Sequence, residues 1–167
     1  MEQQLLKYFD VIGGLSIHPL VVHLFAVLTT LVSLVTLWQL ARNRRGLWNR
    51  LSLLGGIAFV GLFVAVLSGE ALATRVGYED IKALGHNKYA DLLLILACAQ
   101  FILLLVIRWW DSRRRRSAQW VRPLTIFVLG IVAALTVAAA GMAVYTGERA
   151  VWSGEIAHTT FGDHSDN

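Results

Sequence analysis

The sequence of 167 residues has few charged residues, only two prolines and a single cysteine. Charged residues make up 16% of the chain, against roughly 25% in soluble domains. The lone cysteine, Cys98, excludes a disulfide within the chain. The sequence also lacks a phosphate-binding loop, a dinucleotide-binding glycine fingerprint and a Ser/His/Asp arrangement. These absences predict no independent catalysis by this chain.

Charge is missing altogether from long stretches of the sequence. The stretches without Asp, Glu, Lys or Arg are residues 19–41, 51–69, 92–107 and 123–147. A membrane-spanning helix needs about 20 apolar residues at roughly 1.5 Å rise each. The third stretch reaches this length when Lys88, Asp91 and Arg108 lie at its ends and extend toward the headgroups.

We therefore predict an all-α fold, an integral membrane four-helix bundle that forms one domain over residues 1–167. The predicted spans lie at about 19–41, 51–70, 86–109 and 123–147, followed by a tail at 148–167. The lipid bilayer is the first predicted partner of the chain.

Acidic residues are almost absent from two of the three predicted connections. Those connections and their borders carry the basic residues Arg42, Arg44, Arg45, Arg50, Arg108, Arg113, Arg114, Arg115, Arg116 and Arg122. The opposite side carries every acidic residue except Asp111. This asymmetry places the arginine-rich loops in the cytoplasm and both termini on the outer side of a bacterial inner membrane. Anionic headgroups account for the arginines, so the net charge of +4 indicates no nucleic-acid partner.

Polar residues far apart in the sequence reach similar heights at the outer ends of the predicted helices. By helical rise, His23 lies roughly 28 Å above Arg42, Glu70 roughly 30 Å above Arg50 and His86 roughly 33 Å above Arg108. An ionisable group at membrane depth that faces the bundle indicates a functional site. The alternative is a set of interfacial side chains in contact with water.

His18 and His23 are five residues apart, which places them about 140° apart around a helix. Metal-binding pairs on one helix are usually four residues apart, so this spacing favours different roles. Our preferred assignment has His23 and His86 ligating the iron of haem b from two helices. His18 would contact the haem edge or a quinone, and Glu70 would orient an imidazole. The alternatives are a Zn or Cu site of His18, His86, His158 and a carboxylate, or no cofactor.

Small residues recur at a spacing of four in two predicted spans. One set is Gly61, Ala65 and Gly69, and the other is Gly130, Ala134 and Ala138. Such residues let helices approach closely in lipid, where packing drives association. The alternative is that they make room for a flat cofactor.

The segment from His18 to Phe25 resembles the opening of the bacterial domain-of-unknown-function family 2231, predicted membrane proteins with four helices. Gly69-Glu70 resembles the small residue followed by an acid that this family has after its second helix, and His86-Asn87 resembles the histidine and polar residue that open its third helix. Two features depart from it. The proline that usually follows the second histidine is absent, and the closing motif matches either with Ser153 in place of histidine or in a shifted register that uses His158.

The resemblance implies a respiratory or redox setting, because members of the family are sometimes joined to Rieske iron–sulfur or cytochrome c-like domains. We therefore predict a membrane-embedded, haem b-binding electron-transfer protein or respiratory-complex subunit, with its site near the outer face. Its partners would be a redox protein or other subunits. Two alternatives remain open: a cofactor-free accessory or assembly subunit, and an outer-side membrane protein that binds Zn or Cu.

Overall fold

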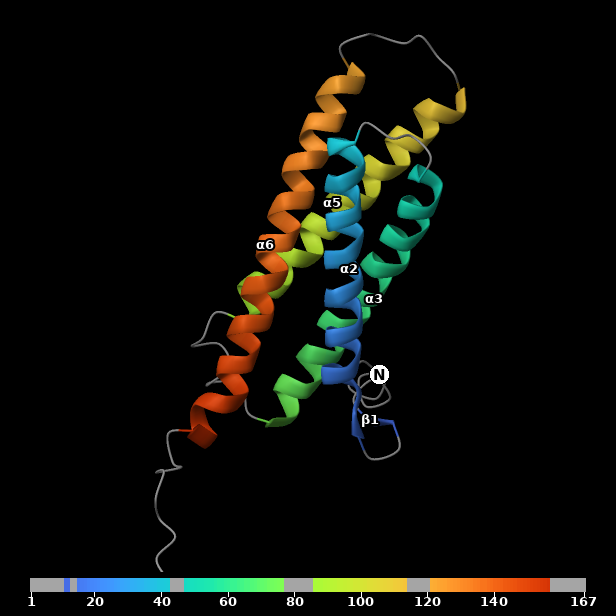
Figure 1. Cartoon of the computed structure of the whole chain (residues 1–167). Coiled ribbons are helices and arrows are strands. Elements are labelled where there is room, and N and C mark those ends of the chain that lie inside the picture. Colours follow the sequence, from blue (N-terminus) through green and yellow to red (C-terminus); the bar gives the residue numbers. More distant parts are fainter. Residues whose placement is uncertain (1–10, 13–14, 43–46, 77–85, 114–120, 157–167) are drawn as a thin grey trace, which may run out of the picture.

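The computed structural model describes residues 11–12, 15–42, 47–76, 86–113 and 121–156. Within them the chain forms four long helices, namely α2 (Ile17–Ala41), α3 (Trp48–Val76), α5 (His86–Arg113) and α6 (Val121–Ile156). They run alternately up and down in one bundle (Figure 1). A short antiparallel pair, β1 (Val11–Ile12) and β2 (Leu15–Ser16), precedes α2.

Each of the four helices contains an apolar segment long enough to cross a membrane. These segments are Leu20–Ala41, Trp48–Glu70, Asn87–Ser112 and Arg122–Arg149. The long apolar runs seen in the sequence therefore fold as helices, as predicted. The last helix is longer than its predicted span, because α6 continues to Ile156.

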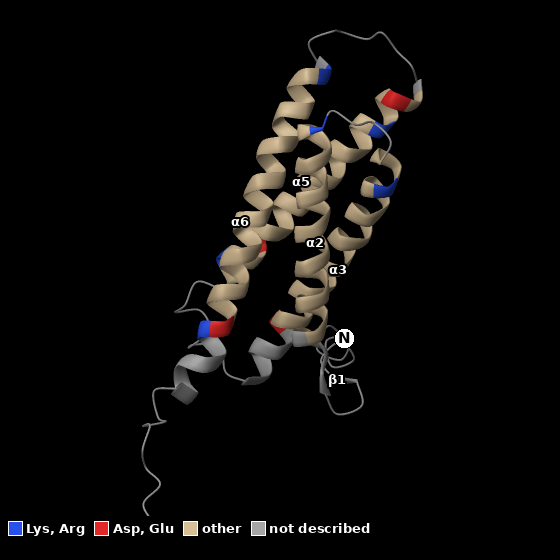
Figure 2. Cartoon of the chain, in the orientation of Figure 1, with Lys and Arg blue, Asp and Glu red and all other residues tan. Residues whose placement is uncertain are grey.

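Charged residues gather at the two ends of the bundle and leave the middle apolar (Figure 2). We call one end the histidine end: α2 begins there, α3 ends there and α5 begins there. The opposite, arginine end holds the last turn of α5 and the first turn of α6, which are joined by an ion pair of 3.2 Å between Arg122 and Asp111. Which end faces the cytoplasm stays a prediction from the charge asymmetry.

The helices pack in a ring, so that α2 and α5 lie diagonally across it, each between α3 and α6. Two apolar clusters fill the interior. The cluster toward the arginine end contains Val32, Trp48, Leu51, Leu104, Ile107 and Leu129. The cluster toward the histidine end contains Leu62, Leu93, Ala97, Ala139, Ala140 and Ala143. The outer faces carry exposed apolar side chains such as Leu24, Leu31 and Ile95, which suits a surface surrounded by lipid.

The small residues of α3 allow close helix packing, as predicted. A Cβ atom added at Gly61 would overlap the ring of Phe25, and one added at Gly69 would lie 2.7 Å from Cε1 of His18. Ala65 between them is buried. Side chains of α2 therefore lie directly against the backbone of α3, where any larger residue would prevent their approach.

The corresponding prediction for α6 is wrong. Ala134 and Ala138 are exposed. The buried stripe includes Leu129, Ala133, Thr136, Ala140 and Ala143, with the buried Ala139 and Thr146 beside it. The reason is helical geometry: a step of four residues turns about 40° more than a full circle, so repeated steps of four drift off one face. The buried stripe alternates steps of four and three residues and stays on that face.

Candidate functional site

His18 is held against α3 by hydrogen bonds at the histidine end. Helix α2 begins at Ile17, two residues before Pro19, so His18 lies in its first turn. Its Nδ1 atom lies 3.0 Å from the carbonyl oxygen of Ala65 and 3.1 Å from Oγ of Ser68. A carbonyl oxygen can only accept a hydrogen bond. The Nδ1 atom of His18 must therefore carry the hydrogen that it shares with Ala65.

This contact sets the tautomer of the imidazole. With the hydrogen on Nδ1, the neutral ring of His18 has its lone pair on Nε2. Ser68 is buried and donates to the same carbonyl oxygen of Ala65 at 2.9 Å, which fixes the acceptor. Metal-ligating histidines typically donate their second ring N–H to a carbonyl or carboxylate in this way.

His23 has a different position, as its spacing from His18 predicts. Its side chain is exposed on the surface of α2, next to the exposed Leu24 and near Val27. The two histidines of α2 therefore face different sides of the helix. A group bound by His23 would lie on the outer surface of the bundle rather than between the helices. Ligation of one iron by His23 and His86 stays a prediction.

The remaining candidate residues are only partly described. His86 is the first residue of α5, and its backbone lies at the same end as His18 and Glu70. Its side chain, and the whole of His158, lie outside the described residues. Glu70 is exposed and directly follows Gly69. Among the described side chains, no three of His, Cys, Asp or Glu gather closely enough to hold a metal ion.

The spaces beside two glycines of α3 are not open to a haem. The spaces beside Gly61 and Gly69 are filled by Phe25 and His18 of the chain itself. A cavity between α2, α3 and α5 has room for about one water molecule. The interpretation that the small residues of α3 make room for a flat cofactor is therefore not supported at Gly61 and Gly69.

Two polar residues of the core did not feature in the sequence prediction. Ser33 of α2 and Gln100 of α5 are both buried, and they meet across the diagonal of the bundle with 2.9 Å between Oγ and Oε1. The signal was present in the sequence, because Gln100 lies in the middle of a stretch without charge. Burying a side-chain amide at such a depth costs free energy unless the amide is hydrogen-bonded.

The comparisons with known proteins agree with this architecture. The family model of a predicted membrane protein, DUF2231, matches residues 14–160. Neither the curated proteins nor the solved structures give a match.

Proposed function

Because the chain belongs to this family of predicted membrane proteins, DUF2231, we propose that it is a haem b-binding electron-transfer subunit of a respiratory assembly, with its site at the histidine end. One observation carries this proposal: the Nδ1 atom of His18 donates to the carbonyl oxygen of Ala65, 3.0 Å away. His18, with its ring oriented by this hydrogen bond, would hold the haem iron through Nε2. The haem, when bound, would supply the one-electron chemistry.

The proposed roles of the two histidines on α2 follow from their surroundings. His18 is the proposed ligand of this helix, because its ring is oriented by Ala65 and Ser68. His86, at the start of the diagonally opposite helix α5, is the proposed second ligand. His23 is exposed, so it is better placed to contact a partner subunit than to ligate a haem between the helices. Glu70 is proposed to orient an imidazole N–H.

The proposed orientation follows from the distribution of charge. Arginines concentrate at one end of the bundle, and the positive-inside rule places that end in the cytoplasm. The histidine end would then face the periplasmic side of a bacterial inner membrane, where it could exchange electrons with a redox partner or with other subunits of a respiratory complex.

A cofactor-free accessory subunit is the second candidate function. The closed packing favours it, since Phe25 and His18 occupy the spaces that the glycines of α3 leave. In this case His18 would serve only to fasten α2 to α3. A Zn or Cu site that combines His18 with His86 and His158 is the third candidate, and it would use the same Nε2 atom of His18.

Elemental and haem analysis of the purified protein tests this proposal. We expect protein made in haem-supplied cells to contain iron in near-stoichiometric amounts, extractable as haem b. Protein made under haem limitation is the matched control and should contain far less iron with the same fold by circular dichroism. Zinc or copper in place of iron would support the metal-site candidate, and protein free of iron, zinc and copper would support the accessory subunit.

A further inference from the structure

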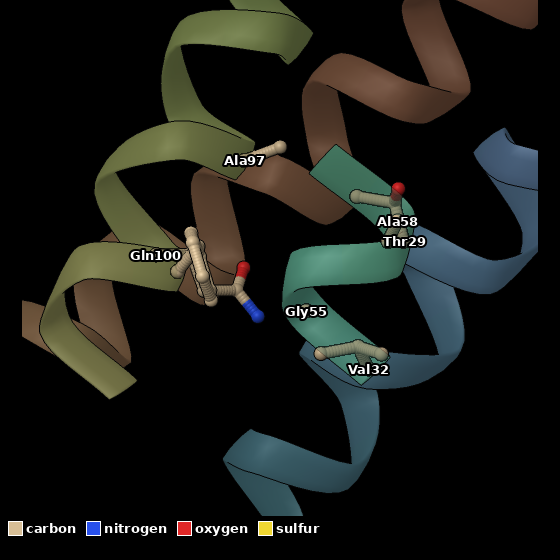
Figure 3. Close-up of a pocket in the computed structure, with 7 residues that line it drawn as sticks. Thr29, Val32, Gly55, Ala58, Ala97 and Gln100 are labelled. Carbon is tan, nitrogen blue, oxygen red and sulfur yellow. The ribbon is translucent and has the colours of Figure 1, made fainter. Parts of the chain in front are cut away.

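A small cavity lies between α2, α3 and α5, at the level where the two apolar clusters meet. Its lining residues are Thr29, Val32, Gly55, Ala58, Ala97, Gln100 and Phe101 (Figure 3). All of them except Phe101 are buried. The ring of Phe101 stacks on Phe59, with 6.2 Å between the ring centroids. The cavity therefore lies near the middle of the membrane-spanning segments and is lined by two polar residues, Thr29 and Gln100.

The hydrogen bonds around Ser33 determine which end of the Gln100 amide faces this cavity. Oγ of Ser33 lies 2.8 Å from the carbonyl oxygen of Thr29 and 2.9 Å from Oε1 of Gln100. Both oxygens only accept, whereas a hydroxyl has a single hydrogen to donate. If Oε1 of Gln100 faces Ser33, one of the two contacts of the Ser33 hydroxyl therefore lacks a hydrogen.

Both contacts are satisfied when the amide of Gln100 is turned over. The two amide termini have nearly the same shape, and the hydrogen-bond network decides between them. With Nε2 toward Ser33, Gln100 donates to Oγ of Ser33, and Ser33 donates to the carbonyl of Thr29. The terminus of Gln100 that points toward Gly55 (Figure 3) is then the oxygen, an acceptor at the cavity.

Thr29 contributes a second acceptor. Its hydroxyl donates its hydrogen to the carbonyl oxygen of Phe25, 2.7 Å away, so the lone pairs of Oγ1 remain to accept. Because Thr29 and Gln100 both line the cavity, together they would provide two acceptors for a ligand with two donor hydrogens. The cavity has room for about one water molecule, and a buried water needs two to four polar partners.

We infer that one water molecule binds in this cavity and donates its hydrogens to Oε1 of Gln100 and Oγ1 of Thr29. The water would complete a polar connection between the diagonal helices α2 and α5 at mid-depth in the bundle. Its binding depends on Thr29, Gln100 and Gly55, all of which lie away from the histidine end. This inference is therefore independent of the function proposed above.

Nuclear magnetic resonance of the full-length chain, labelled with ¹⁵N-glutamine in nanodiscs of deuterated lipid, tests this inference. We expect rotating-frame cross-relaxation between water and the side-chain amide of Gln100, with the sign that distinguishes proximity from hydrogen exchange. Loss of the signal in Gln100→Leu assigns it.

Filling the cavity provides the decisive comparison. In Gly55→Ala the new methyl lies 3.2 Å from Cδ1 of Leu104 and 3.9 Å from Val32, so we expect the water signal of Gln100 to disappear. Gly130→Ala is the matched control, since its methyl would make only an ordinary contact of 3.5 Å with Leu40. Ala58→Val replaces Gly55→Ala if that variant does not fold. Absence of the signal in the wild type, or its survival in the filled variant, would overturn the inference.

Discussion

Gly61→Ala is expected to destabilise the bundle by about 1–3 kcal/mol, the usual cost of overpacking a close-packed interior. The added Cβ would overlap the ring of Phe25, which lies directly on the backbone of α3. The ring or the helix must shift, and either movement loses contacts in the cluster toward the histidine end. Unfolding of the purified protein by sodium dodecyl sulfate, followed by circular dichroism, measures the change.

Gly141→Ala is the matched control for this prediction. It makes the same chemical change on α6, where the added methyl meets no atom within 4 Å. Alanine favours a helix over glycine by up to about 1 kcal/mol, so this variant should be as stable as the wild type or more stable. Adding Phe25→Ala to Gly61→Ala should recover part of the loss. Equal effects of the two glycine variants would contradict the packing described for α2 and α3.

His18→Ala is expected to lower the stability of the haem-free protein by about 1–3 kcal/mol, more than His23→Ala does. The first substitution removes the hydrogen bond to the Ala65 carbonyl and the ring that covers Gly69. The second removes an exposed side chain from the outer surface of α2. Haem-free protein is needed because a bound ligand would add its own stabilisation.

The same unfolding assay compares the two histidine variants. A loss of stability in His23→Ala equal to that in His18→Ala would mean that the two histidines share one environment, contrary to the structure. A loss confined to His18→Ala would show that the ring fastens α2 to α3, whatever it binds through Nε2.

The sequence predicts the helices because local chemistry determines them. A long apolar stretch without charge is stable in a bilayer as a helix, since a helix satisfies its own backbone hydrogen bonds. The different surroundings of His18 and His23 also follow from local geometry, because five residues turn a helix by about 140° relative to the starting direction. The approach of Phe25 to Gly61 is consistent with the small-residue pattern of α3.

The partners of individual polar residues are not predictable in this way. Ser33 and Gln100 are 67 residues apart, and His18 and Ala65 are 47 apart. Such pairs depend on which helices become neighbours and on how each helix is rotated, and composition specifies neither. The stripe on α6 shows the difference, because Ala134 and Ala138 match the small-residue pattern and yet are exposed. Whether His18 or His23 ligates an iron depends on such neighbours as well and stays a prediction.

The position of the candidate site at the histidine end determines what would surround a bound cofactor. The oriented imidazole of His18 lies at the histidine end, where it packs against Gly69 and Ala65 of α3. Haem at this position would be partly enclosed by whatever covers the histidine end. Burial and nearby hydrogen bonds influence the reduction potential of a haem iron. A subunit that covers the histidine end would therefore change the reduction potential of a haem bound there.

A dithionite-reduced minus oxidised visible spectrum of the purified wild type, His18→Ala and His23→Ala tests whether the protein binds haem b and whether His18 is a ligand of the iron. We expect a b-type α band in the wild type and the same band in His23→Ala. The band should be lost in His18→Ala, because this substitution removes the imidazole held by Ala65. A full band in His18→Ala together with its loss in His23→Ala would contradict the assignment of His18 as the ligand. Absence of the band from haem-supplied wild type would exclude haem and leave the metal site or the accessory subunit.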